Sequence, residues 1–457
     1  MQIISHGAAR IVTGSCHQLS SGGKNILIDC GMYQGSKDIV RLNYKEFGFN
    51  PAEINAVIIT HGHIDHCGLL PKLVKKGFSG TIYASNATAD LIPVMLADSA
   101  FIQERETEDE NRRRMRKGQE PREPLYTRED AEKVTSLIRP FSYRQQFAVT
   151  EEFECTFQDA GHVIGSSIAE IRVKSTGKKI VFSGDIGQFD VPIINDPTFI
   201  DSADYVFIES TYGDTVREKM IPRDDELFEH IKETIGRGGK LLIPSFALER
   251  TQELIYAISR LKHEKKDFPK VPVYLDSPLA IKITEVFKKH PEIYDTEAKN
   301  RSDDPFDFPG FMMTPEVEQS KSITKSNSPC IVIAGSGMCN AGRIRHHIRH
   351  GIDDRQNRLL FIGYQAPGTL GRILLDGEKN IKMMGREFRV LADVARISTF
   401  SAHADQKELV KWLDGYKIKP EKVFLVHGEE DTISIFQKFL SEKGYNTDIP
   451  VMGKELF

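Results

Sequence analysis

The sequence predicts an α/β fold built in two parts, and three observations carry that prediction. Up to about residue 209 the chain consists mainly of short apolar runs typical of strands. From 210 to 390 such runs alternate with helical patterns, as in a doubly wound parallel sheet. Metal-capable residues recur in both outer segments but not in the middle one. We therefore expect one discontinuous domain, residues 1–209 and 391–457, interrupted by an inserted domain over 210–390.

Composition supports two packed domains. At 457 residues the chain is too long for one ordinary core, and 40% hydrophobic with 28% charged residues is typical of globular proteins. The net charge of -4 does not indicate nucleic-acid binding, so any basic surface must be local. The densest basic run, residues 112–117, is more typical of a solvated helix face than of a binding site. No apolar stretch approaches the roughly 20 residues that cross a bilayer.

The six cysteines are scattered and none forms a Cys-x-x-Cys pair. Met1 leads directly into a strand-like run rather than a signal peptide. Scattered cysteines without a secretion signal indicate reduced thiols, and we expect a cytoplasmic protein.

The elements of the outer domain follow in order. Thr127 is expected to cap a helix that starts at 128. A hairpin is expected from 167–173 and 179–182 around Ser175-Thr176-Gly177. The segment 107–123 is highly charged and expected to be an exposed helix or loop. The remaining strands are expected at 26–28, 56–60, 81–84, 397–400 and 422–426, and the remaining helices at 87–106 and 406–413.

The inserted domain is expected to alternate strand and helix throughout. The polar segment 295–325 is expected to wrap the surface. Strands are expected at 240–243, 271–275, 329–334 and 358–362, and helices at 227–235, 249–261, 279–289 and 343–350.

The most informative motif is His61-Gly62-His63-Ile64-Asp65-His66, directly after a strand-like run. Histidine nitrogen and carboxylate oxygen both suit Zn²⁺. Ligands this close on a tight loop cannot all reach one ion, so the spacing suggests two metals. Histidines in a turn are otherwise usually just solvated. Cys67 adjoins the cluster and is interpreted as a packing residue.

Five further metal-capable residues follow strand-like runs. One such residue would more often be a hydrogen-bonded core polar group, but several point to strand ends that converge on one cleft. These residues are His162, Asp185, Glu209, His403 and His427.

Together these motifs give the chain a specific resemblance. It resembles metallo-β-lactamase-fold hydrolases of the β-CASP branch, which contains RNA- and DNA-cleaving enzymes such as ribonuclease J and the nuclease subunit of the pre-mRNA cleavage machinery. The resemblance implies an αββα metallo-β-lactamase sandwich with an inserted doubly wound β-CASP domain. Besides the histidine motif and Glu209, it is carried by segments 243–250, 335–338, 363–372, 401–405 and 426–428.

The resemblance also implies a ligand set for two Zn²⁺ ions. His61, His63 and His162 would hold one ion. Asp65, His66 and His427 would hold the other. Asp185 would bridge both.

The resemblance assigns roles around those ions. Asp65 and Asp185 would act in catalysis, and His403 would contact the scissile phosphate and protonate the leaving oxygen. Glu209 would hydrogen-bond His403 and keep it charged. Asp29 would orient a ligand histidine, although a turn residue before a glycine is an equal interpretation. His17 is a weaker candidate for the cleft.

Substrate contacts are expected mainly from the inserted domain. A glycine-containing loop before a helix can hold phosphate with backbone N–H groups, although tight turns often need glycine anyway. The neighbouring pair His346-His347 is expected on the surface. The expected substrate contacts are Ser245, Arg250, Gly335, Ser336, Gly337, Arg343, Arg372 and His403.

We therefore expect a zinc-dependent RNA phosphodiesterase in which a water activated by two ions attacks phosphorus and leaves a 5′-phosphate. Single-stranded RNA in an interdomain cleft is the expected substrate, with endonuclease action preferred over exonuclease action. DNA is not excluded as the substrate, because the motifs contact phosphate and not sugar. A homodimer is compatible with the sequence. The alternatives are a hydrolase of small esters, thioesters or lactams, and an inactive scaffold of an RNA-processing complex.

Overall fold

The computed structural model describes residues 1–217, 223–301, 303–397 and 402–457. The chain divides into two compact units, one of Met1–Arg217 with His403–Phe457 and one of Glu218–Ala402. These limits differ from the expected 209/210 and 390/391, partly because β19 (Asp393–Arg396) pairs with a strand of the second unit. Residues 398–400 of an expected strand, and Ser401, lie outside the described residues.

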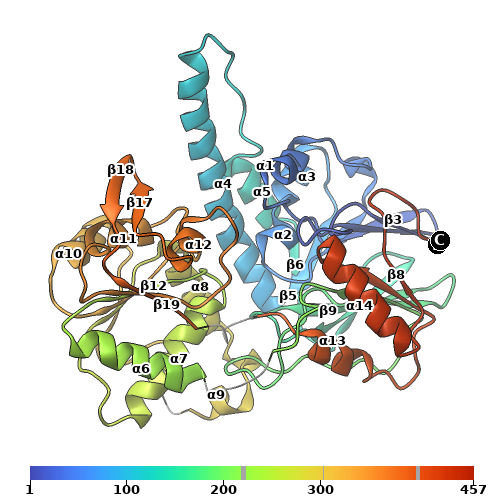
Figure 1. Cartoon of the computed structure of the whole chain (residues 1–457). Helices are drawn as coiled ribbons and strands as arrows, with labels where there is room; N and C mark the ends of the chain where they lie inside the picture. Colours follow the sequence, from blue (N-terminus) through green and yellow to red (C-terminus); the bar gives the residue numbers. More distant parts are fainter. Residues whose placement is uncertain (218–222, 302, 398–401) are drawn as a thin grey trace. The chain divides into compact units, whose positions relative to one another are not determined.

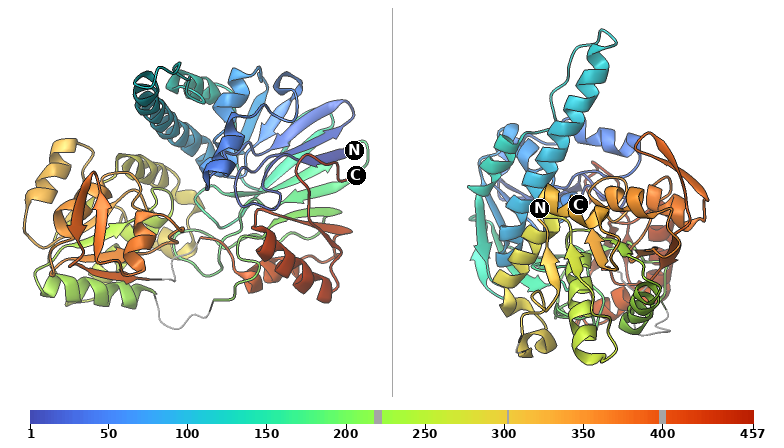
Figure 2. Two further views of the ribbon diagram at one scale, coloured as in Figure 1. Left: turned by 45° about the horizontal axis from the view of Figure 1, so that its top comes forward. Right: turned by 90° about the vertical axis from the view of Figure 1, so that its left-hand side faces the viewer.

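The first unit contains two sheets (Figures 1 and 2). The first has the order β1-β2-β3-β4-β5-β6: β1 (Gln2–Ser5), β2 (His17–Ser21), β3 (Lys24–Ile28), β4 (Ala56–Ile58), β5 (Thr81–Ser85) and β6 (Ile138–Phe141). The second has the order β21-β20-β11-β10-β9-β8-β7: β7 (Gln146–Ala148), β8 (Phe153–Asp159), β9 (Ser167–Val173), β10 (Lys179–Phe182), β11 (Tyr205–Glu209), β20 (Lys422–Val426) and β21 (Thr447–Asp448). The expected hairpin is confirmed as β9 and β10.

Three hydrophobic clusters give this unit its layers. One cluster joins side chains of both sheets and includes the stacked rings of Phe182, Phe207 and Phe424. A second lies between the first sheet and α3, α4 and α5, and a third between the second sheet and α13 and α14. Apolar side chains therefore project from both faces of each sheet, and each sheet packs on the other sheet on one face and on helices on the other. This confirms the αββα sandwich. The helices are α1 (Lys37–Val40), α2 (Ile64–Cys67), α3 (Leu70–Lys75), α4 (Asn86–Met115), α5 (Arg128–Thr135), α13 (Gln406–Leu413) and α14 (Glu430–Glu442), with 3₁₀ turns η1 (Arg41–Tyr44) and η2 (Pro51–Glu53).

Helix α4 is longer than expected and takes in much of segment 107–123. Its buried side chains end at Ala100, and the rest of the helix extends away from its own unit (Figures 1 and 2). The basic run 112–117 covers the end of this exposed helix. The Thr127 cap is confirmed, because its Oγ1 accepts from the backbone N–H of Asp130 and the Asp130 carboxylate accepts in return.

The second unit is built on the predicted doubly wound sheet. Its six strands are all parallel, in the order β14-β13-β15-β12-β16-β19. Segment 295–325 does more than wrap the surface, because it contributes edge strand β14. The other elements are β12 (Leu241–Pro244), β13 (Val273–Leu275), β14 (Phe311–Met313), β15 (Ile331–Ala334), β16 (Arg358–Phe361), hairpin β17 (Asn380–Met383) and β18 (Arg386–Arg389), α6 (Arg223–Gly236), α7 (Arg250–Glu264), α8 (Pro278–Lys289), η3 (Pro291–Ile293), α9 (Thr296–Asn300), α10 (Val317–Lys325), α11 (Ile344–Gly351) and α12 (Leu370–Leu375).

The two chain ends lie side by side, since Ile4 forms a bridge with Glu455 (Figure 2). Among the described helices, none combines the length and the apolar character needed to cross a membrane.

Candidate metal centre

Strand ends of both sheets of the first unit supply the candidate site. In the first sheet β4 is followed by the histidine loop, and Asp65 and His66 lie in α2. In the second sheet β10, β11 and β20 are parallel neighbours in register, so their C-terminal ends share one edge. That edge carries Asp185, Glu209 and His427, and His162 follows β8.

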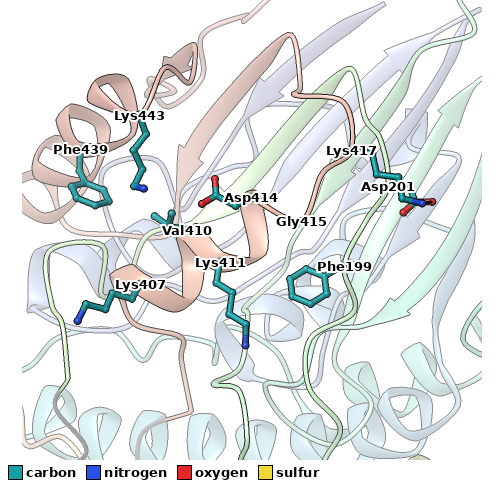
Figure 3. Close-up of a pocket in the computed structure, with 10 residues that line it drawn as sticks. All are labelled: Phe199, Asp201, Lys407, Val410, Lys411, Asp414, Gly415, Lys417, Phe439 and Lys443. Atoms are coloured by element: carbon teal, nitrogen blue, oxygen red, sulfur yellow. Dashed lines mark hydrogen bonds and ion pairs between the residues drawn. The ribbon is translucent and has the colours of Figure 1, made fainter.

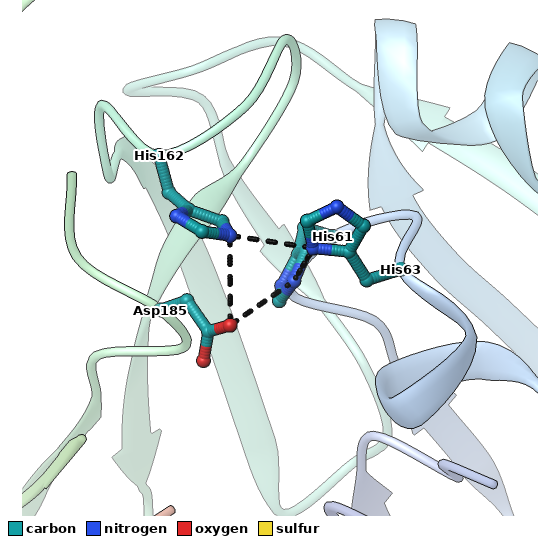
Figure 4. A group of neighbouring side chains, drawn as sticks. All are labelled: His61, His63, His162 and Asp185. Atoms are coloured by element: carbon teal, nitrogen blue, oxygen red, sulfur yellow. Dashed lines mark hydrogen bonds and ion pairs between the residues drawn. The ribbon is translucent and has the colours of Figure 1, made fainter. Parts of the chain in front are cut away.

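One group of ligand-type atoms consists of His61, His63, His162 and Asp185 (Figure 4). Nδ1 of His63 lies 3.1 Å from Nε2 of His61 and 3.3 Å from Nε2 of His162. Oδ2 of Asp185 lies 3.5 Å from Nε2 of His61 and 3.6 Å from Nε2 of His162. Ligands about 2.0–2.1 Å from a tetrahedral metal ion stand about 3.3 Å apart, so these separations suit a divalent metal.

A second group consists of Asp65, His66 and His427. Nε2 of His427 lies 3.1 Å from Nε2 of His66 and 3.5 Å from Oδ2 of Asp65. Oδ1 of Asp185 lies 3.3 Å from the His66 nitrogen and 3.6 Å from the His427 nitrogen. The Asp185 carboxylate thus directs one oxygen at each group. Its Oδ1 is buried and accepts no hydrogen bond from the described residues, as expected of an atom that a cation would satisfy.

His61 and His63 of the first group are neutral, and the carboxylate shared by both groups is ionised. Burial lowers the pKa of His63 to about 4 and holds that of His61 well below its usual value, so both rings are neutral. Burial alone would raise the pKa of Asp185, but His427, His66 and His61 hold it well below its usual range. Burial alone would lower the pKa of His66, but Asp185 and Asp29 raise it well above its usual value, so a cation at the second group would take the place of a proton. The donor set therefore fits a divalent metal.

Asp29 supports the second group from behind. Its Oδ2 accepts a hydrogen bond of 2.7 Å from Nδ1 of His66, and its Oδ1 accepts from the backbone N–H of Thr60 at 2.8 Å. A carboxylate only accepts, so Nδ1 of His66 is the donor in this bond and Nε2 is the nitrogen directed at the site. Asp29 also stands in the left-handed region, at φ 62°, which lets the chain turn at the end of β3.

A third group joins Asp185, Glu209 and His403. Nδ1 of His403 lies 3.1 Å from Oε1 of Glu209 and 3.9 Å from Oδ2 of Asp185. Burial alone would lower the pKa of His403, but the facing Glu209 and, less strongly, Asp185 raise it above its usual value. Glu209 is fully buried, and Oε1 also accepts from the backbone N–H of Ile186 at 2.7 Å. His403 is thus held as a proton-carrying group beside the candidate ligands.

Arg217 and Tyr212 are site residues that sequence reasoning missed. Nη1 of Arg217 donates to the carbonyl of His403 at 2.9 Å, and its backbone N–H donates to Asp405 at 2.8 Å. The guanidinium lies 4.2 Å from the ring centre of Tyr212, which packs against His403. Neither tyrosine nor arginine is a residue type that the search for metal ligands considers, so the pattern that found the ligands could not find them.

Two other histidine interpretations need correction. His347 was expected on the surface but is buried, and its Nε2 lies 2.7 Å from Oδ2 of Asp276. His17 lies in the core rather than a cleft, packed on Phe182 and Phe207.

Burial raises the pKa of the Cys67 thiol, which donates to the Gly62 carbonyl, as expected of a packing residue.

The expected substrate contacts in the second unit fall into two sets. Ser245 and the loop 335–337 follow the adjacent parallel strands β12 and β15 and lie together. The arginines are engaged elsewhere. Arg343 donates to Asp276 and to the carbonyls of Thr314 and Pro315, because its helix packs over that corner of the sheet. Arg250 is buried against Glu253, and Arg372 is exposed and paired with Asp376.

Two sheets in an αββα sandwich, with buried His and Asp groups at one edge, define a metal-dependent hydrolase. Residues 12–256 match the Metallo-beta-lactamase superfamily, residues 251–374 the Beta-Casp domain, and residues 387–450 the Zn-dependent metallo-hydrolase RNA specificity domain. The chain belongs to the metallo-β-lactamase superfamily and to its β-CASP branch, as the motifs predicted.

Individual relatives agree with that assignment. Ribonuclease TTHA0252 of Thermus thermophilus is 35% identical over 457 residues, and the match covers 99% of each chain. Transcription termination factor FttA of Methanocaldococcus jannaschii is 31% identical, over 93% of this chain and 66% of that protein. A crystal structure of a protein of unknown function from Enterococcus faecalis superposes with a TM-score of 0.58 at 12% identity, covering 100% of this chain and 99% of that one, and shares the fold.

Proposed function

We propose that this chain is a zinc-dependent RNA phosphodiesterase that holds two ions and cleaves single-stranded RNA. The observation that carries the proposal is the Asp185 carboxylate, which directs one oxygen at each of two ligand groups. Mixed histidine and carboxylate donors favour zinc. Three histidines and Asp185 would hold one ion, and Asp65, His66, His427 and Asp185 the other. RNA is the proposed substrate because a relative that spans the same length is named as a ribonuclease.

The protein's own groups then divide the work. When bound, the ions supply a water of lowered pKa and offset negative charge on a phosphoryl oxygen. Nδ1 of His403 is engaged by Glu209, which leaves its Nε2 free to face a substrate oxygen. His403 is the proton donor to the leaving oxygen, since the carboxylate of Glu209 raises its pKa and so favours its protonated form. Ser245, Gly335, Ser336 and Gly337 are proposed contacts for the RNA backbone.

Two further points belong to the proposal. Cleavage is endonucleolytic, and the protein works in a reducing, cytoplasmic setting. Six free cysteines, all buried, support the second point.

The test combines metal analysis with product sizing. Purified protein is incubated with 5′- and 3′-labelled single-stranded RNA, with and without chelator, and its zinc content is measured. We expect two zinc ions per chain, internal products with 5′-phosphates, and loss of cleavage with chelator that added zinc reverses. Turnover of nitrocefin or a glutathione thioester with no RNA cleavage would overturn the proposal in favour of a small-molecule hydrolase. Equal cleavage of a 2′-deoxy substrate would show that the enzyme does not select RNA over DNA.

A further inference from the structure

A basic and aromatic groove lies in the first unit, outside the metal centre. It has a volume of about 720 Å³ and lies among α13, the C-terminal end of α14 and the segment around Phe199 (Figure 3). The side chains that give it its character are Phe199, Lys407, Lys411, Lys417, Phe439 and Lys443. The groove therefore combines cations with aromatic rings on a protein whose net charge is -4.

Three of the lysines keep their charge available. Within the described ranges, Lys407, Lys411 and Lys443 have no carboxylate at ion-pair distance, whereas Lys417 pairs with Asp201 at 2.9 Å. The other acidic lining residue, Asp414, accepts a hydrogen bond from the Tyr445 hydroxyl. Lys407 and Lys411 are one helical turn apart on α13, so both project from the same face. The groove thus has a surplus of positive charge that suits a polyanion.

Phe199 is an aromatic platform held in place by the fold. It is 45% exposed, and its ring stacks on Phe189 with centroids 5.7 Å apart. A Cβ at Gly415 would come within 2.3 Å of the ring, so the ring packs directly on that glycine. The indole N–H of Trp412 donates to the Thr198 carbonyl at 2.9 Å and ties this segment to α13. One face of the Phe199 ring is supported while much of the side chain stays open to a ligand.

Each of two aromatic rings has a lysine close by. Nζ of Lys411 lies 3.6 Å from the centre of Phe189, and Nζ of Lys443 lies 5.6 Å from the centre of Phe439. Phe189 is itself buried, so Phe199 and Phe439 are the rings that the groove offers to a ligand. Single-stranded nucleic acid is recognised by lysines along its backbone and aromatic rings under its bases. A duplex keeps its bases stacked inside and would leave the rings unused.

Helix α13 links the groove to the candidate active site. This helix begins at Gln406, three residues after His403, and Lys407 lies in its first turn. Its Glu408 accepts a hydrogen bond from the backbone N–H of Phe189 at 3.1 Å, and Gly187 forms a bridge with His403. Resting on the proposed function, we propose that this groove binds the single-stranded RNA chain that flanks the cleavage site, outside the metal centre.

The main test compares RNA length. Lys407→Ala/Lys411→Ala and Phe199→Leu are measured against wild type with a long oligouridylate and with one too short to leave the metal centre. Leucine keeps the apolar packing on Gly415 but cannot stack with a base. Lys438→Ala is the matched control, since Lys438 is exposed on α14 and does not line the groove.

We expect the groove variants to bind the long RNA about tenfold more weakly by fluorescence anisotropy in chelator. The lysine pair should also reduce the slope of log affinity against log salt by about 1.4. Cleavage of the short RNA should be unchanged, and the control should match wild type. Photo-crosslinking of an iodouridine-substituted RNA should label the peptides that carry Phe199 and Phe439.

The results separate the groove from the proposed function. If the groove variants bind the long RNA with unchanged affinity and salt slope and cleave it like wild type, the groove does not bind RNA. That result would favour a protein partner at the groove. Weaker binding by the groove variants, together with no cleavage of either RNA by wild-type protein, would overturn the hydrolysis and leave the groove supported. An equal loss of RNA affinity in Lys438→Ala would also overturn RNA binding by the groove, because the loss would then follow from the removal of any surface positive charge.

Discussion

Glu209 and His403 are 194 residues apart in the sequence, yet Nδ1 of His403 lies 3.1 Å from Oε1 of Glu209. The carboxylate comes from the end of β11 and is fully buried, while the imidazole keeps about a fifth of its side chain exposed. A buried acceptor thus fixes one nitrogen of the ring and leaves the other open. In the proposed reaction this pair transfers the proton, whereas other residues bind the metal. Proton transfer and metal binding can therefore be tested with different variants.

Glu209→Gln should alter the pH dependence of cleavage. Glu209 raises the pKa of His403, so the acid form persists to higher pH in the wild type. Without that charge the pKa falls, and the alkaline limb of the kcat profile should move to lower pH, with kcat near pH 8 reduced about tenfold. The measurement is kcat against pH at saturating RNA, with zinc content as the control. An unmoved alkaline limb would contradict this role.

His403→Ala should leave zinc bound while slowing cleavage strongly. A positioned general acid contributes about 10²- to 10⁴-fold to a rate, so kcat should fall within that range. Zinc is measured on the same preparation, with Glu209→Gln as the comparison. Loss of zinc from His403→Ala would show that this histidine is a ligand instead.

Asp185→Asn should lose metal and activity together. The amide has one oxygen and no charge, so it cannot serve two ligand groups as the carboxylate does. We expect zinc content to fall by at least one ion per chain and cleavage to fall below detection. Circular dichroism checks that the fold is intact. Full zinc occupancy in a folded Asp185→Asn protein would contradict a shared ligand.

Asp29→Ala should weaken zinc binding without abolishing the fold. The hydrogen bond of 2.7 Å from His66 fixes that ring, and loss of such a partner typically costs about 10- to 100-fold in metal affinity. Competition with a chromogenic chelator measures the change. Unaltered affinity would mean that Asp29 serves only the turn at the end of β3.

Asp276 should contribute to acid stability in the second unit. Burial alone would raise the pKa of its carboxyl group, but hydrogen bonds from His347, Ser320 and Arg343 lower that pKa from 3.8 to about 2. A depressed pKa in the folded state gives stability that is complete above about pH 4 and is lost as the pH falls toward 2.

Asp276→Asn should therefore remove part of the slope of unfolding free energy against pH between about 4 and 2. Urea unfolding is followed by far-UV circular dichroism, because the single tryptophan, Trp412, reports on the other unit. Identical slopes in the two proteins would show that Asp276 titrates normally.

Local patterns were sufficient for much of this molecule. The apolar run before His61, the turn between β9 and β10 and the cap at Thr127 each depend on residues a few positions apart, so the sequence could predict them. The alternation of strand and helix over 210–390 indicated the parallel sheet. Because parallel strands end at one edge, it also followed that residues after several strands would meet.

Tertiary packing alone decided which atoms meet. The two oxygens of Asp185 face separate ligand groups because β10 lies beside β11, which in turn lies beside β20, a register that no local pattern contains. Packing also buried His347 against Asp276, brought Arg343 to the same carboxylate and placed Phe199 on Gly415. Side-chain contacts between distant segments depend on how whole elements are placed. The sequence by itself therefore determined the elements and the chemical types of ligand, and the packing of the sandwich and of the parallel sheet determined their partners.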